Sequence, residues 1–275
     1  MPTAIVTGAS SGIGLETAIG LAKKNFDLIL VARNSNKLDI IKKNIELEFG
    51  ISCDIYSYDL SLMRSNFEFH SYIVSKYQNI DVLVNNVGAI FMDRSITDEH
   101  LERTFALNHM SYFVLSILFI ESFESLRIVN VSSEAHRGIS LRLNDLENSH
   151  GYYGWHAYKR SKLANIYFTY ELNRRFIEKD LTVNCLHPGL VNSDFANNNS
   201  LPFQIISSII KYFGISVKDG ALTSIYLASE DNLSNASGLY FDKCMPRKSS
   251  PISYNEEIAK SLWAYSTEIM NSFRR

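Results

Sequence analysis

TAIVTGASSGIG, residues 3–14, is the stretch that decides the fold. Residues 4–7 have the composition of a short buried strand, and a helical pattern begins where the three glycines end. Glycine permits a tight turn and a close approach of the backbone, while the N-terminus of the following helix offers unpaired N–H groups to a phosphate. The stretch therefore predicts a dinucleotide-binding turn, and a plain strand-to-helix turn is the alternative. We expect cofactor contacts at Gly8, Ser10, Ser11, Gly12, Ile13 and Gly14.

Strands and helices alternate along the chain. Short aliphatic runs predict strands at residues 4–7, 28–31, 53–56, 82–84, 128–131 and 182–186. Helical periodicity predicts helices between them, at about residues 12–24, 35–48, 61–77, 97–121 and 154–178. Asn34 or Ser35 is expected to cap the second helix, and Thr97 the fourth. This alternation is typical of an α/β protein of the Rossmann type, a doubly wound parallel sheet with helices on both faces.

The composition limits the classes of function that we expect. The chain has 275 residues, with 27 lysines and arginines against 29 aspartates and glutamates, and a formal net charge of −2. This balance argues against a nucleic-acid-binding surface. The longest strongly apolar run, residues 112–120, is shorter than the roughly 20 residues of a membrane span, and residues 1–3 carry no leader pattern. We therefore expect neither a transmembrane segment nor secretion.

Three cysteines, Cys53, Cys185 and Cys244, have neither disulfide-framework nor zinc-ligand spacing. We expect reduced thiols in the cytoplasm and no metal site. No linker or repeat divides the chain, so one domain over residues 1–275 is the simplest prediction.

Late in the sequence, the polar stretch 196–200 and the apolar stretch 201–215 interrupt the alternation of strands and helices. We expect a substrate lid at about residues 191–217. A helix that dips into a membrane surface and an ordinary packed helix are the alternatives. Lys211 is the only basic residue in 201–215, so attraction to an anionic membrane would be weak.

The glycine turn and several later segments resemble the short-chain dehydrogenase/reductase family. Residues 7–14 are similar to the TGxxxGIG turn of that family, and matching segments follow in the family order up to about residue 242. The matching segments are Asp59-Leu60, Asn85-Asn86-Val87-Gly88, Asn108, Ser132-Ser133, Tyr158-Lys159-Arg160-Ser161-Lys162 and Pro188-Gly189. The resemblance implies further cofactor contacts at Asp59, Leu60, Asn86, Gly88, Tyr158, Lys162, Pro188, Gly189, Val191 and Ser193.

The end of the second predicted strand bears on the choice of cofactor. A carboxylate there would bind the ribose 2′-hydroxyl of NAD(H), whereas a basic side chain accommodates the 2′-phosphate of NADP(H). Residues 31–34 read VARN, without a carboxylate. We therefore expect Arg33 to bind the phosphate, with help from Lys37, and NADP(H) to be preferred over NAD(H). In the alternative, Arg33 is only a solvated loop residue.

Tyr158 and Lys162 are the candidate proton-transfer pair. They are four residues apart, so on a helix they lie on one face and can act on the same ligand. A tyrosine needs a nearby cation to favour its phenolate near neutral pH. The family resemblance implies that Tyr158 exchanges a proton with the substrate oxygen and that Lys162 also holds the nicotinamide ribose. It further implies that Ser133 hydrogen-bonds the substrate oxygen, with Ser132 as the alternative, and that Asn108 supports a water relay to Lys162.

The segment between Ser133 and Tyr158 is longer than is usual in the family, and its length indicates a particular subgroup of the family. Together with the helix that follows, it resembles the retinol dehydrogenases and the WW-domain oxidoreductases. His136 in this segment could orient a substrate, although a lone histidine in a loop is more often a surface or packing residue. Membrane-bound retinol dehydrogenases usually carry an N-terminal anchor, a pattern that this sequence does not show. This departure argues against attachment through such an anchor and, with it, against a retinoid substrate.

These observations predict an oxidoreductase that transfers a hydride between NADP(H) and a carbonyl or alcohol carbon. Trp155, Phe195 and Phe203 predict an apolar pocket, so we expect a small apolar aldehyde, ketone or alcohol, retinal-like molecules included. Two other hypotheses stay open, a catalytically quiet NADP(H)-binding sensor or scaffold and a light-dependent reductase of a tetrapyrrole double bond. Family members are often homodimers or homotetramers built through their long helices, here residues 97–121 and 154–178.

Overall fold

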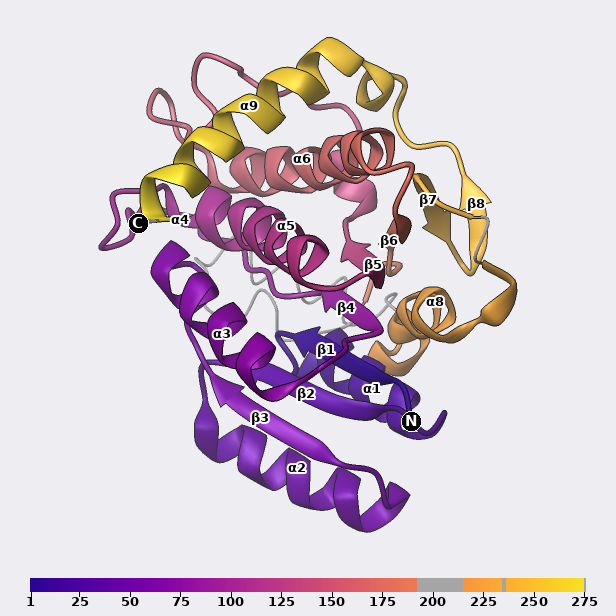
Figure 1. Ribbon diagram of the computed structural model, residues 1–275. Coiled ribbons are helices and arrows are strands. Elements are labelled where there is room, and N and C mark those ends of the chain that lie inside the picture. The colour runs from indigo at the N-terminus through magenta and orange to yellow at the C-terminus, as the bar shows by residue number, and fades with distance from the viewer. Residues whose placement is uncertain (192–214, 234–235, 275) are drawn as a thin grey trace.

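One sheet of eight strands runs through the part of the chain that the computed structural model describes, residues 1–191, 215–233 and 236–274. In chain order the strands are β1 (Thr3–Thr7), β2 (Asp27–Ala32), β3 (Cys53–Ser57), β4 (Val82–Asn85), β5 (Ser125–Val131), β6 (Asp180–His187), β7 (Leu239–Asp242) and β8 (Met245–Arg247). The spatial order is β3-β2-β1-β4-β5-β6-β7-β8, and β1 to β7 pair in parallel. The sheet is therefore doubly wound, as predicted (Figure 1).

Burial on both faces explains why the central strands are continuous aliphatic runs. In β1, the side chains of Ala4, Ile5 and Val6 have no exposed surface. β8 differs, because it pairs antiparallel with β7 and all three of its residues are exposed. Its Pro246 cannot donate to a ladder, and an exposed edge strand is where a proline is tolerated.

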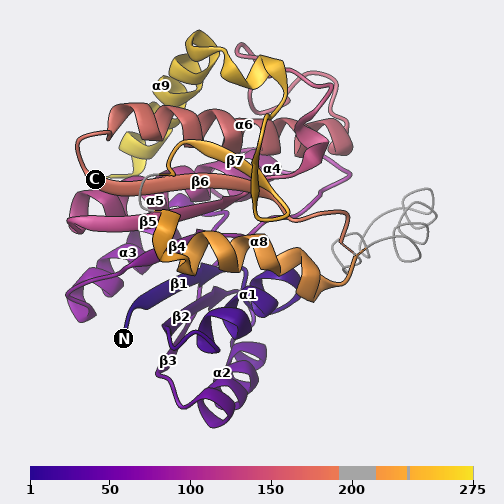
Figure 2. The ribbon, with the colours of Figure 1, turned by 90° about the vertical axis from the view of Figure 1, so that its right-hand side faces the viewer.

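Helices cover both faces of the sheet. Within the described residues the helices are α1 (Gly12–Ala22), α2 (Ser35–Phe49), α3 (Met63–Lys76), α4 (Arg103–Phe105), α5 (Ser111–Ser122), α6 (Gly154–Arg175), α8 (Val217–Ser229) and α9 (Glu256–Phe273). A π-helical segment, η1 (Ala106–Met110), joins α4 to α5, and short 3-10 turns are η2 (Glu134–His136), η4 (Asp231–Leu233) and η5 (Pro251–Tyr254). In Figure 2, α6 and α9 lie on one side of the strands and α1, α2 and α8 on the other, each side with its own apolar core.

The helix that the sequence predicts over residues 97–121 begins later, at Arg103. Thr97 does not cap it, because residues 97–101 form a tight turn in which the Thr97 N–H donates to the Leu101 carbonyl at 2.8 Å. The cap is Glu102, whose buried carboxylate accepts hydrogen bonds from two N–H groups of the first helical turn. A local turn and a carboxylate cap thus decide the start of this helix.

The predicted boundaries of the other helices lie within a few residues of the observed ones, and Asn34 caps α2 by accepting from the Lys37 N–H at 3.0 Å. Four elements, β7, β8, α8 and α9, have no counterpart among the predicted elements. α9 has a signal that could have indicated it. Its buried residues recur three or four positions apart, and the list is Ala259, Leu262, Ser266 and Met270.

α9 covers the two long helices α5 and α6. Residues 111–120 of α5 are all buried, and the rings of Phe113 and Trp263 lie 5.0 Å apart between centroids. The stretch Arg103–Ser122 is long and apolar enough to cross a membrane, but 94% of its apolar window is buried in the protein, so core packing explains its composition. The helices through which the resemblance implied self-assembly are thus covered by α9 of the same chain.

Candidate active site

The predicted site residues gather at one edge of the sheet. The carboxyl ends of parallel strands meet at the same edge, so segments far apart in sequence come together there. In spatial order the segments are Asp59-Leu60 after β3, Arg33 after β2, the glycine turn after β1, Asn86 to Gly88 after β4, Ser133 after β5 and Pro188-Gly189 after β6.

The glycine turn between β1 and α1 is shaped for a close ligand. Gly8 and Gly12 have φ of 68° and 58°, and a Cβ at Gly14 would overlap the Gly8 carbonyl oxygen. Gly12, by contrast, faces open space. Ser11 caps α1 without a side-chain hydrogen bond, and the first turn of α1 holds no acidic residue. The N–H groups at this helix end can therefore serve an anion such as a pyrophosphate, and the turn fits a dinucleotide.

Thr7, the last residue of β1, joins the glycine turn to the segment after β4. Its hydroxyl accepts hydrogen bonds from the N–H groups of Asn86 and Val87 at 3.0 and 3.1 Å. The Asn86 side-chain amide donates in return to the Thr7 carbonyl at 2.9 Å. Asn86, predicted as a cofactor contact, thus also holds the turn in place. The sequence prediction omitted Thr7, although its position directly before Gly8 could have indicated it.

The other predicted contacts of this half of the site differ in exposure. Arg33 is exposed, and within the described ranges no hydrogen bond or ion pair engages its guanidinium, which leaves it available to a phosphate. Asp59 is half-buried, and its carboxylate accepts from the Ser61 N–H and hydroxyl at 3.0 and 2.7 Å. The Leu60 side chain is 2% exposed in the apolar core, so only its backbone can face a cofactor. Ser10 and Ile13, in the turn itself, are half-buried.

Tyr158 and Lys162 lie one turn apart on α6, and Ser133 reaches Tyr158 from the end of β5. The phenol of Tyr158 and the Ser133 side chain share a hydrogen bond. The Lys162 side chain is buried, donates to the Val131 carbonyl at 2.9 Å and places its Nζ 5.8 Å from the centroid of the Tyr158 ring. The structure therefore brings these three predicted residues together.

Burial dominates the acid–base properties of the pair on α6. It raises the pKa of Tyr158 to about 12, and the hydrogen bond with Ser133 works in the opposite direction. Burial also lowers the pKa of Lys162 to about 7. Tyr158 is therefore protonated at neutral pH, which is the state that can donate a proton to a carbonyl oxygen. Lys162 can change its charge near neutral pH in the protein without a ligand.

The two neighbouring serines have different partners. Ser132 is buried, and its hydroxyl donates to the main-chain carbonyl of Lys162 at 2.8 Å. Ser133 is half-buried and is the serine bonded to Tyr158. This arrangement favours Ser133 over Ser132 as the residue that contacts a substrate.

Asn108 lies in η1 and clamps the segment after β4. Its side-chain amide exchanges two hydrogen bonds of 2.9 Å with the backbone of Ala89. A Cβ at Gly88 would lie 3.3 Å from Asn108 Oδ1 and 3.4 Å from Lys162 Nζ, so the absence of a side chain lets Asn108 and Lys162 approach. The carbonyl of Asn108 accepts from the side-chain amide of Asn165 at 2.8 Å. The site prediction omitted Asn165, which lies three residues after Lys162 on the same helix.

The segment after β6 borders a cavity of about 740 Å³. Gly189 has φ of 92° and lines the cavity beside Pro188. The lining also includes the apolar Leu190 and Leu222 and charged residues of both signs, among them Arg137 and Asp242. Among the described residues that line it, neither Ser133 nor Tyr158 appears. The cavity thus adjoins the predicted cofactor segment and has the volume of a small-molecule site.

The predicted lid and two predicted cofactor contacts belong to the same region. Val191 forms an isolated parallel bridge with Ile215. Ser193, Phe195, Phe203 and most of the predicted lid lie outside the described residues, which resume at residue 215.

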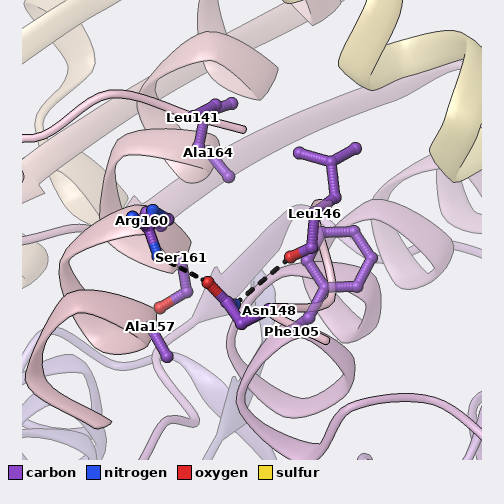
Figure 3. Close-up of a pocket in the computed structure, with 8 residues that line it drawn as sticks. All are labelled: Phe105, Leu141, Leu146, Asn148, Ala157, Arg160, Ser161 and Ala164. Carbon is purple, nitrogen blue, oxygen red and sulfur yellow. Dashed lines mark hydrogen bonds between the residues drawn. The ribbon is translucent and has the colours of Figure 1, made fainter. Parts of the chain in front are cut away.

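A second cavity, of only about 10 Å³, lies beneath the loop that precedes α6 (Figure 3). Phe105, Leu141 and Leu146 line it, and the Arg160 guanidinium donates to Asn148 Oδ1 at 2.7 Å beside it. That volume holds about one water molecule at most, so a substrate does not fit. Three residues of the segment between β5 and α6, Leu141, Leu146 and Asn148, thus lie beside the α6 residues that line the same small cavity.

Comparison with known proteins agrees with this architecture. Residues 2–202 match the family model described as short chain dehydrogenase. Retinol dehydrogenase 13 of Homo sapiens is 33% identical over 278 residues, which cover 98% of this chain and 84% of that protein. The WW domain-containing oxidoreductase of Drosophila melanogaster is 33% identical over 279 residues, which cover 98% of this chain and 68% of that protein.

Solved structures share the fold. An uncharacterised protein from Mycobacterium paratuberculosis superimposes with a TM-score of 0.79 at 27% identity, over 98% of this chain and 94% of that one. A variant of the actinorhodin polyketide ketoreductase, solved with NADPH, superimposes with a TM-score of 0.69 at 23% identity, over 87% of this chain and 94% of that one.

Proposed function

Since the chain belongs to the short-chain dehydrogenase family, we propose that it is an NADP(H)-dependent oxidoreductase that interconverts an apolar aldehyde or ketone and the corresponding alcohol. The family supports an oxidoreductase acting on CH–OH groups, and the cofactor preference and substrate class are the proposed part. One observation carries the proposal. The Tyr158 phenol, bonded to Ser133 and one helical turn from Lys162, lies at the same sheet edge as the glycine turn.

In carbonyl reduction, the residues on α6 and β5 handle the oxygen of the substrate. Tyr158 donates its phenolic proton to that oxygen, and the Ser133 hydroxyl orients the oxygen by a hydrogen bond. A positive charge on Lys162 stabilises the phenolate that Tyr158 leaves behind. NADPH, when bound, supplies the hydride that the carbonyl carbon receives. Alcohol oxidation uses the same groups in reverse.

The residues proposed to hold the cofactor come from the glycine turn and the neighbouring strand ends. The N–H groups at the start of α1 serve the pyrophosphate, and the exposed Arg33 serves the 2′-phosphate. The remaining proposed contacts are Asp59, Leu60, Asn86, Gly88, Lys162, Pro188, Gly189, Val191 and Ser193. The preference for NADP(H) is supported by the absence of a carboxylate at residues 31–34 and by NADPH in a solved structure of the same fold.

An apolar substrate is supported by two observations. Apolar side chains pack around Tyr158, namely those of Ile90, Met92, Ala135 and Trp155. Relatives at about 33% identity are named retinol dehydrogenase, so retinal-like molecules belong among the candidates. For the cellular compartment we propose the cytoplasm, which the three free cysteines support.

The first test is calorimetric titration of the protein with NADPH and with NADH. We expect the tighter binding for NADPH. The second test follows NADPH oxidation with a panel of apolar aldehydes and ketones, retinal included, beside small hydrophilic carbonyl compounds, in the dark and under illumination. We expect turnover of the apolar carbonyls in both conditions.

Each hypothesis has its own outcome in these tests. Tight NADPH binding without any turnover would favour a sensor or scaffold. Turnover of hydrophilic carbonyls alone would exclude the apolar pocket. Equal binding of NADPH and NADH would overturn the role of Arg33, and binding of neither would overturn the enzyme assignment.

A further inference from the structure

His136 lies three residues after Ser133, and the mechanism above does not use it. Its side chain is completely buried in η2, directly after the catalytic end of β5. The ring packs edge-on against Tyr240 of β7, with centroids 5.2 Å apart. Both ring nitrogens have partners. Nδ1 lies 2.6 Å from the Ser133 carbonyl oxygen, and Nε2 lies 3.0 Å from the main-chain nitrogen of Ser250.

These two contacts require one protonation state of the His136 ring. The Ser250 N–H is a donor, so Nε2 must be an unprotonated acceptor. The Ser133 carbonyl is an acceptor, so Nδ1 must carry the proton and donate. Burial lowers the pKa of His136, which is consistent with a neutral ring. The ring therefore links two segments that are 114 positions apart in the chain, with Nδ1 always the donor and Nε2 always the acceptor. We call this link the His136 bridge.

The segment on the far side of this bridge is itself anchored on α6. Residues 249–254 include η5, and the Tyr167 hydroxyl donates to the Ile252 carbonyl at 2.6 Å. The hydroxyls of Tyr170 and Ser249 lie 2.7 Å apart. Tyr167 and Tyr170 belong to the helix that carries Tyr158 and Lys162. Both parts of the catalytic site are thus hydrogen-bonded to the 249–254 segment. Ser133 is linked to it through His136, and α6 is linked to it through Tyr167 and Tyr170.

We propose that His136 is a positioning residue that holds the main chain of Ser133 against the 249–254 segment, so that the Ser133 hydroxyl stays in contact with the Tyr158 phenol. The inference rests on the proposed function, in which Ser133 orients the substrate oxygen. It explains why a histidine is suited to this place. A buried aromatic ring with one donor and one acceptor satisfies both backbone groups, which would otherwise lose a partner in the interior.

Three substitutions of His136 separate its two hydrogen bonds. In His136→Asn the side-chain amide reaches the place of Nδ1 and keeps the donor to Ser133. In His136→Gln the amide oxygen reaches the place of Nε2 and keeps the acceptor for Ser250. His136→Phe keeps a ring against Tyr240 and loses both bonds.

A matched pair at Ser250 tests the same bridge from the other end. Ser250 has φ of −64°, which a proline can adopt, and Ser250→Pro breaks the bridge because it removes the N–H donor and places the proline ring against His136 Nε2. Ser250→Ala keeps the N–H. Its lost hydroxyl is buried and has no hydrogen-bond partner among the described residues, so this variant is the control.

The kinetic test measures kcat, KM, the Kd for NADPH and the thermal midpoint of each variant. We expect kcat to fall about tenfold to a hundredfold in His136→Phe, with the Kd for NADPH within about twofold of the wild type. Ser250→Pro should lose kcat in the same direction, Ser250→Ala should not, and His136→Asn should recover part of the loss. The limb of the pH–rate profile that reports Tyr158 should move to higher pH in His136→Phe, because the Ser133 hydrogen bond lowers the pKa of Tyr158.

A second measurement does not need turnover. In ¹⁵N-labelled protein at pH 7, the ring nitrogen shifts of His136, assigned from the His136→Gln variant, should show a protonated Nδ1 and a bare Nε2. A proton on Nε2, or a doubly protonated ring, would overturn the inference whether or not the protein is active.

The kinetic outcomes distinguish the inference from the proposed function. A wild type without turnover on any carbonyl compound contradicts the proposed function. An active wild type whose His136→Phe variant loses thermal stability but keeps kcat and its pH profile contradicts the inference alone, since that pattern describes a packing residue.

Discussion

Around the glycine turn the site is made of backbone, whereas around Tyr158 it is made of side chains. We call the segments after β1 to β4 the nucleotide half and the segments after β5 and β6, with α6, the catalytic half. In the nucleotide half, Gly8 and Gly14 let backbone segments pack closely, because a Cβ at Gly8 would meet Val87 and a Cβ at Gly14 would meet the Gly8 carbonyl oxygen. In the catalytic half, Ser133 and Tyr158 are bonded to each other, and His136 ties the segment to a distant stretch of chain. A site formed by backbone groups can be recognised from a short sequence motif, whereas a site formed by side chains from distant segments exists only once the chain has folded.

The largest expected effect is in the catalytic half. Tyr158→Phe removes the phenolic proton, and turnover should fall by about 10² to 10⁴-fold because proton transfer to the substrate oxygen is lost. The Kd for NADPH should stay within about twofold, since the backbone of the nucleotide half is untouched. Stopped-flow NADPH oxidation and calorimetry measure the two quantities. Tyr153→Phe, an exposed position just before α6, is the control. Loss of NADPH binding in Tyr158→Phe would show that cofactor binding in the nucleotide half depends on Tyr158 of the catalytic half.

The second largest effect is expected in the nucleotide half, where a substitution should abolish NADPH binding itself. Gly14→Ala places a Cβ against the Gly8 carbonyl oxygen, so the free energy of unfolding should fall by about 3 kcal/mol and NADPH binding should be lost. Urea unfolding and calorimetry test this prediction. Gly50→Ala is the matched control, because Gly50 ends α2 with φ of 67° and faces open space. It should cost about 1 kcal/mol of stability and leave NADPH binding intact.

A third prediction concerns the pH dependence of stability at the boundary of the two halves, where η1 faces Asn165 of α6. His109 in η1 is completely buried, and burial lowers its pKa from 6.5 to about 4. The unfolded chain therefore binds a proton between these values while the folded chain does not, and stability that is present above pH 6.5 is lost as the pH falls toward 4. The loss should reach about 3 kcal/mol at most.

Urea unfolding between pH 7.5 and 4 measures this slope. His109→Gln should reduce it, because the group that titrates is removed. His100→Asn, at an exposed position with φ of 64° that asparagine tolerates, should leave it unchanged. An equal slope in wild type and His109→Gln would contradict the prediction.

The smallest expected effect is at the rim of the nucleotide half. Arg33→Ala should weaken NADPH binding about tenfold and leave NADH binding nearly unchanged, because only the contact with the 2′-phosphate is removed. Calorimetric titration with both cofactors gives the ratio. Lys43→Ala, on the exposed side of α2, removes a positive charge at a site without a proposed phosphate contact. A similar loss in Lys43→Ala would mean that net charge, rather than Arg33, favours NADPH.

The arrangement of the segments in the nucleotide half could be predicted from the sequence, while the cofactor contacts there stay predictions. The order of short aliphatic runs and helices determines the doubly wound sheet, and each predicted contact follows a predicted strand. Even so, the role of Thr7 depends on the neighbouring strand. Its position before Gly8 marks it as part of the turn, but its hydroxyl can accept from Asn86 and Val87 only because β4 lies beside β1.

The catalytic half was predicted as a set of residues but not as a structure. Tyr158, Lys162 and Ser133 come from local spacing and from the family resemblance, and the structure brings them together. The bridge from His136 to Ser250 was not predicted, because its two ends are separated by α6, β6 and the elements that follow. The start of the helix at Arg103 was misjudged for a related reason. The residue that caps it, Glu102, has a carboxylate buried by surrounding elements, and burial is not visible in a local pattern.

The cover that α9 places over α5 has a consequence for the order of synthesis. Phe113 is in the chain long before Trp263, the ring that packs against it. While the polypeptide emerges from the ribosome, the part of the apolar surface of α5 that α9 covers at Phe113 therefore stays open until residues 256–273 have been translated. Nascent chains that stop short of α9 should be clients of chaperones, and completion of the last helix should release them.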